Sequence, residues 1–101
     1  MKIKIDKNID TAFKICESAL KVLDIKIDKI DYNKGYILAS TKSGWLSWGE
    51  NIEIRIDSNS LVSTSIQISS KAKAQLITWG KNDKNIREIG ETIKKIGKST
   101  R

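Results

Sequence analysis

The three tryptophans of the chain lie in two short segments that resemble each other. Residues 43–51 read Ser-Gly-Trp-Leu-Ser-Trp-Gly-Glu-Asn, and residues 78–82 read Thr-Trp-Gly-Lys-Asn. Indole faces can stack on a ring or a sugar, and lysines beside a helix N-terminus can hold an anion. The candidate ligand-binding residues are therefore Trp45, Trp48, Glu50, Trp79, Lys81 and Asn82.

A purely structural role is the alternative for both Trp-Gly segments. Large aromatic side chains are mostly packing residues, so the tryptophans would close the open end of the core. Glu50 would then pair with Lys81, since surface ion pairs are common. General packing behaviour favours this structural role over ligand binding.

Catalysis finds little support among the polar residues. The chain has no histidine, which excludes imidazole bases, most catalytic triads and the common zinc sites. The carboxylates are dispersed, and Gly44 and Gly49 lack the Gly-Lys-Ser/Thr ending of a phosphate loop. Cys16 lies within an apolar stripe, which is typical of a buried thiol. We expect no enzymatic activity, no metal site and no cofactor.

The formal net charge of +7 raises nucleic acid as a partner. Its basic residues are almost all lysines, scattered along the chain, with arginine only at positions 55, 87 and 101. Phosphate recognition favours the bidentate guanidinium of arginine. A solvated basic surface is therefore the favoured interpretation, and a nucleic-acid-binding module is the alternative.

The length of 101 residues fits a single domain, residues 1–101. No apolar run approaches the roughly 20 residues that span a bilayer, and residues 1–6 alternate instead of forming a signal-peptide core. We expect a cytoplasmic protein without a membrane partner. Its partner would be a ligand or another protein, and a homodimer is a further hypothesis because two-fold dimers are the commonest oligomers.

Hydrophobic periodicity predicts a strand and a helix at the start of the chain. Residues 2–5 alternate Lys-Ile-Lys-Ile, as in a short edge strand. From Asn8 the apolar residues recur at spacings of three and four, which predicts an amphipathic helix capped by Asn8. Residues 25–32 alternate again but change phase at Asp28, as a strand with a bulge would.

Three further strands are predicted in the middle of the chain. Gly35 suits a tight turn that needs a positive φ, and 36–42 form the returning strand. Residues 52–57 alternate isoleucine with charged residues, which indicates a half-buried strand. The polar run 57–60 predicts a turn, followed by a strand over 61–69.

A second helix is predicted at the end of the chain. Residues 70–81 fit neither the helical nor the strand period of apolar residues and stay unassigned. Asn82 or Asp83 would cap a helix whose buried stripe is made of isoleucines, and Gly97 would end it. Gly90 lies on the apolar face of this helix. Because glycine lowers helix stability relative to alanine, its presence there indicates a close crossing with another element.

The element order β-α-β-β-β-β-α predicts an α+β two-layer sandwich, an antiparallel sheet with two helices on one face. This order resembles one repeat of the TATA-binding-protein-like fold and, less closely, the helix-grip fold. The two Trp-Gly segments are also similar to those of small uncharacterised bacterial domains. The resemblance implies a fold and not a function, because one fold hosts unrelated functions. The best-known member of the first fold binds DNA through its sheet, which prompts the nucleic-acid alternative, yet the exposed strand residues here are neither strongly basic nor aromatic. Alternating strand directions should bring both Trp-Gly segments to one end of the molecule.

Overall fold

The computed structural model describes residues 1–41, 50–72 and 81–99, with side chains described for 1–41, 51–69 and 86–99. The elements follow the predicted order β-α-β-β-β-β-α. They are β1 (Lys2–Ile5), α1 (Ile9–Val22), β2 (Lys26–Asp31), β3 (Tyr36–Ser40), β4 (Glu50–Ser60), β5 (Ser63–Ala72) and α2 (Lys81–Ser99).

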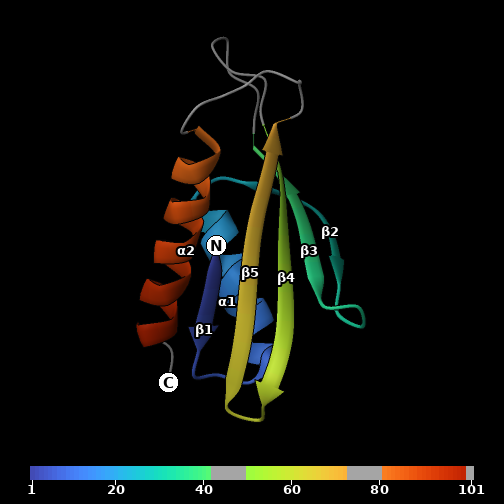
Figure 1. Ribbon diagram of the computed structural model, residues 1–101, viewed down its shortest axis with the longest axis vertical. Helices are drawn as coiled ribbons and strands as arrows, with labels where there is room; N and C mark the ends of the chain where they lie inside the picture. Colours follow the sequence, from blue (N-terminus) through green and yellow to red (C-terminus); the bar gives the residue numbers. More distant parts are fainter. Residues whose placement is uncertain (42–49, 73–80, 100–101) are drawn as a thin grey trace.

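The strands form one antiparallel sheet in the order β1-β5-β4-β3-β2. Both helices cover the same face of it, so the fold is the two-layer α+β sandwich that the sequence predicts (Figure 1). β1 and β2 are the edge strands. The long β4–β5 hairpin runs along the long axis of the molecule, whose extents are 42 × 26 × 20 Å.

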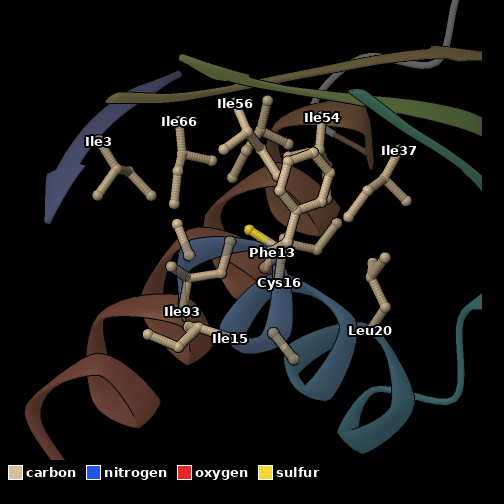
Figure 2. Packing of buried hydrophobic residues seen from close by; sticks show 14 of the residues in the cluster. Ile3, Phe13, Ile15, Cys16, Leu20, Ile37, Ile54, Ile56, Ile66 and Ile93 are labelled. Atoms are coloured by element: carbon tan, nitrogen blue, oxygen red, sulfur yellow. The ribbon is translucent and has the colours of Figure 1, made fainter. Parts of the chain in front are cut away.

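The core lies between the sheet and the two helices (Figure 2). Strand isoleucines alternate with polar residues, so their side chains point to the helical layer, where Phe13 and Leu20 of α1 and Ile93 of α2 meet them. The largest fully buried side chains are mostly isoleucines, namely Ile37, Ile52, Ile54, Ile56, Ile66, Ile68, Ile89 and Ile93. The opposite side of the sheet carries no helix among the described elements, and we call it the open face.

Several local predictions are confirmed. Asn8 caps α1 by accepting a hydrogen bond from the Thr11 amide at 2.8 Å. The β2–β3 register shifts between Ile27 and Lys29, where the change of phase predicts a bulge. Gly35 has a φ of +75°, and a Cβ there would lie 2.6 Å from the Ile56 carbonyl oxygen. This turn therefore requires glycine for both its backbone conformation and its space.

The predicted turn over residues 57–60 is wrong. These residues extend β4, and the turn lies at Leu61 and Val62. The serines do not end the strand here because they pair across the hairpin, Ser58 with Thr64 and Ser60 with Ser63, and Asn59 lies in the register shift between them. Val62 is consequently exposed in the turn, although the sequence predicts it within the strand over 61–69.

The second helix is longer than the sequence predicts. It begins at Lys81, so Asn82 and Asp83 lie inside it and do not cap it, and it continues beyond Gly97 to Ser99. The predicted close crossing at Gly90 is confirmed: a Cβ there would lie 3.0 Å from Ile3 Cδ1 and 2.5 Å from the Met1 sulfur. Glycine thus lets α2 approach β1 closely. The unassigned stretch 70–81 contributes the end of β5 and the first residue of α2.

Candidate functional site

Both Trp-Gly segments connect to the same end of the sheet. β3 ends at Ser40, which lies opposite Asn51 near the start of β4. Glu50 in turn pairs with Ala72, the last residue of β5. The first turn of α2 lies at this end as well (Figure 1). The strand directions on which the predicted convergence depends are therefore confirmed for the elements that flank both segments.

The predicted site residues themselves lie outside the described side chains. This applies to the indoles of Trp45, Trp48 and Trp79 and to the side chains of Glu50, Lys81 and Asn82. The backbone places Glu50 at the start of β4, and Lys81 and Asn82 in the first turn of α2. Whether the six side chains meet, and whether Glu50 pairs with Lys81, stay predictions.

A pocket of about 660 Å³ opens on the sheet at this same end. Its described lining comes from the β2 bulge, the second half of β3, the start of β4 and the later part of β5. The lining residues are Asp28, Leu38, Ala39, Asn51, Ile52, Glu53 and Ser69. We call it the open-face pocket, because Leu38, Asn51, Glu53 and Ser69 alternate with buried residues and so point away from the helices.

The floor of the open-face pocket is a cross-strand row. Leu38 lies opposite Glu53 in the β3–β4 ladder, and Glu53 lies opposite Ser69 in the β4–β5 ladder. Side chains in such directly opposed positions are in contact distance of each other. The row therefore places an aliphatic group, a carboxylate and a hydroxyl side by side, a mixture suited to a ligand with an apolar body and hydrogen-bond donors.

Both carboxylates of the pocket have a basic neighbour on their own strand. Arg55 Nε donates to Glu53 Oε1 at 2.9 Å, and Lys26 Nζ lies 3.9 Å from Asp28 Oδ1. These pairs are solvent-exposed and contribute little to stability. Each pair leaves its carboxylate next to a basic side chain while the carboxylate oxygens can still accept hydrogen bonds from an occupant of the pocket.

Lys29 lies across from Leu38 at the margin of the pocket, where the β2 bulge shifts the register. Its Nζ is 5.8 Å from the centre of the Tyr36 ring. A hydrogen bond with the Tyr36 side chain, followed by the charges of Tyr36 and Asp31, raises the pKa of Lys29 above its ordinary value.

The rest of the open face mixes charges of both signs. One row crosses all five strands and contains Lys2, Gln67, Arg55, Tyr36 and Asp31. The row beside it places Asp57 opposite Ser65 and Ser65 opposite Lys4. Opposite charges interspersed in this way give no single-sign field for a phosphate backbone to follow.

No metal or nucleophilic centre appears in the part of the chain that the structure describes. Within it, no three residues of the His, Cys, Asp and Glu types group together. Cys16 is fully buried in α1; desolvation, and then the charge of Glu17, raises the pKa of its thiol from 9.0 to about 12. A thiol of this kind is inert, as its place in the apolar stripe predicts.

Among the described helices, neither α1 nor α2 is long and apolar enough to cross a membrane.

Comparison of the chain with known protein families and with curated proteins finds no match. The open-face pocket is a feature that sequence reasoning missed, because Leu38 sits in the continuous apolar run Tyr-Ile-Leu-Ala of residues 36–39. A continuous apolar run does not show which of its residues point away from the core. Its register against the clean alternation of β4 would have placed Leu38 beside Glu53 and so on the open face.

Proposed function

We propose that this chain is a small cytoplasmic domain without catalytic activity, which binds a ligand or a protein partner in the open-face pocket. The observation that carries the proposal is the position of this pocket at the end of the sheet where both Trp-Gly segments connect. Its volume, about 660 Å³, falls in the range of small-molecule sites.

The chemistry of the lining supports binding without catalysis. An aliphatic side chain, Leu38, lies beside the polar groups of Glu53, Asn51 and Ser69. Apolar contact would supply affinity, and the few polar groups would orient the occupant. The proposal keeps the six residues of the two Trp-Gly segments as contributors to the site, since both segments connect to the end of the sheet at which the pocket lies.

Nucleic-acid binding is the alternative function, and the open face supports it less. Asp31, Glu53 and Asp57 interrupt its basic residues. The relation to TATA-binding-protein-like domains and to small bacterial α+β domains is likewise proposed, on the element order and the Trp-Gly segments. It carries no argument for DNA binding here, because one fold hosts unrelated functions.

Amide correlation NMR tests the proposal, with a library of aromatic and aliphatic fragments that carry amide or hydroxyl groups as the probe. We expect fragments to shift the amides of Leu38, Asn51, Glu53 and Ser69 and to leave the exposed face of α1 unchanged. Leu38→Gln should weaken these responses, and Val22→Gln, on the exposed side of α1, serves as the matched control. A library in which no fragment perturbs the pocket amides contradicts the proposal.

A further inference from the structure

The β4–β5 hairpin ends in two exposed apolar residues. Leu61 is 90% exposed and Val62 is 70% exposed. They form the β4–β5 turn, and the pocket is lined by residues near the other end of this hairpin (Figure 1). Glycine, asparagine, aspartate and serine dominate such turns. Neither residue has a positive φ, so no special backbone conformation accounts for their presence. The turn itself gives no reason for placing leucine and valine in water.

This hairpin tip is held in one conformation by its flanking polar residues. Asn59 Nδ2 donates to Ser65 Oγ at 2.8 Å and to Ser63 Oγ at 3.3 Å. The Val62 amide donates to Ser60 Oγ at 3.2 Å. Residues 58–65 also carry no charged side chain, although 31% of the whole chain is charged. A preorganised, uncharged apex loses little conformational freedom and little hydration when it is buried.

We infer that the hairpin tip of one copy, Leu61 and Val62, occupies the open-face pocket of a second copy. This inference rests on the proposed function, since it names the partner of that same pocket. The tip cannot fill the pocket of its own chain. Seven residues of β4 lie between Glu53 and Leu61, so eight residue steps separate the two, a distance of roughly 26 Å along an extended strand.

The two surfaces are chemically complementary. Leu38 offers an apolar contact to Leu61 or Val62. The carboxylates of Asp28 and Glu53 accept hydrogen bonds, and the hydroxyl-rich flanks of the tip carry donors. Since Lys26 and Arg55 already neighbour these carboxylates, an uncharged occupant fits better than a strongly cationic one.

A lipid surface is the competing occupant for an exposed apolar tip. Stable membrane attachment generally needs a second signal, such as a basic patch beside the inserted residues. In the sheet row that joins β1, β5 and β4 on the tip side, Lys4 and Asp57 both lie opposite Ser65, so the basic residue there is accompanied by an acidic one. The structure therefore favours a protein pocket, and vesicle binding becomes an outcome of the test.

Sedimentation velocity of the full chain at a series of concentrations provides the test. We expect self-association in the wild type. The double variant Leu61→Ser, Val62→Asn should have an association constant at least about tenfold lower, so that it is monomeric at concentrations where the wild type associates. Leu38→Gln should have the same effect from the pocket side, and Val22→Gln should have none. If Leu38→Gln strongly lowers the melting temperature, Ser69→Lys replaces it as the pocket variant. Residue 69 is exposed, so the lysine side chain should narrow the pocket and weaken self-association in the same way.

Mixing the two defective variants gives the most specific readout. The tip variant retains a pocket and Leu38→Gln retains a tip, so the mixture should form a heterodimer although neither variant associates alone. A monomeric wild type, association of wild-type strength in either variant, or tip-dependent binding to phosphatidylcholine–phosphatidylserine vesicles by a monomer would overturn the inference. If fragments still shift the pocket amides of a monomeric chain, only the self-association is lost and the proposed function stands.

Discussion

Leu38 and Glu53 lie directly opposite each other in the β3–β4 ladder, on the face of the sheet that no described helix covers. Their neighbours along both strands, such as Ile37 and Ile54, are fully buried beneath the helices. The same alternation that builds the core therefore builds the floor of the open-face pocket. A register slip of one residue would exchange the two faces and destroy both.

The turn at Gly35 should depend strictly on glycine. Gly35→Ala places a Cβ 2.6 Å from the Ile56 carbonyl oxygen at a φ of +75°, and we expect it to lower the free energy of unfolding by about 2 kcal/mol or more. Urea denaturation measures the change. Gly97→Ala is the matched control, because its Cβ would meet only Ile15 Cδ1 at 4.0 Å. It should be neutral or stabilising, by up to about 1 kcal/mol.

The buried hydroxyl of Thr64 should contribute measurably to stability. It donates to the Lys7 carbonyl oxygen at 2.8 Å and so ties β5 to the segment before α1. Thr64→Val keeps the shape and removes the donor, which should cost about 1 kcal/mol in urea denaturation. Thr92→Val removes an exposed hydroxyl that bonds within α2, and it should change stability by less than about 0.5 kcal/mol. Equal losses in both variants would contradict this assignment.

The buried thiol of Cys16 should make the fold sensitive to alkali. Its pKa is about 12 in the folded chain against 9.0 for the free group, so the folded state holds the proton more tightly. The associated stability is fully present below pH 9 and is lost as the pH rises toward 12. The free energy of unfolding should fall more steeply with pH in the wild type than in Cys16→Ala, by up to about 1 kcal/mol per pH unit. If the free energy of unfolding falls equally steeply with pH in both proteins, the buried thiol is not the cause of the alkali sensitivity.

Nucleic acid should not bind through the open face. Acidic residues interrupt its basic residues in each row beside the pocket, so we expect a flat titration with mixed oligonucleotides at low salt. Fluorescence anisotropy measures the binding of the oligonucleotides. Binding that weakens steeply with added salt would indicate phosphate contacts and would support the alternative function.

The sequence predicts the fold well where local rules and tertiary packing agree. The isoleucine alternation in β4, the Asn8 cap, the β2 bulge and the Gly35 turn follow from period, capping and backbone conformation, and the structure confirms each. The sequence predicts the fold poorly where cross-strand pairing overrides the preference of individual residues for a turn. Residues 57–60 have the composition of a turn, yet the partners of Asp57, Ser58 and Ser60 in β5 keep the strand extended through them.

The candidate site was only partly predictable. Strand directions correctly placed the ends that flank both Trp-Gly segments together. The pocket depends on which side of β3 Leu38 occupies, and a continuous apolar run does not specify that. The residue types of Leu61 and Val62 also do not reveal that they form an exposed turn, since leucine and valine fit a buried strand equally well.

Calorimetric titration of the strongest-binding fragment into Trp48→Ala and Trp79→Ala tests the central claim most directly. If the Trp-Gly end is a binding site, at least one variant should bind about threefold to tenfold more weakly than the wild type, as expected for the loss of an aromatic contact. Val22→Ala, on the exposed side of α1, should retain the wild-type affinity. Unchanged affinity in both tryptophan variants, with only a lower melting temperature, would show that the indoles are structural and would contradict the claim.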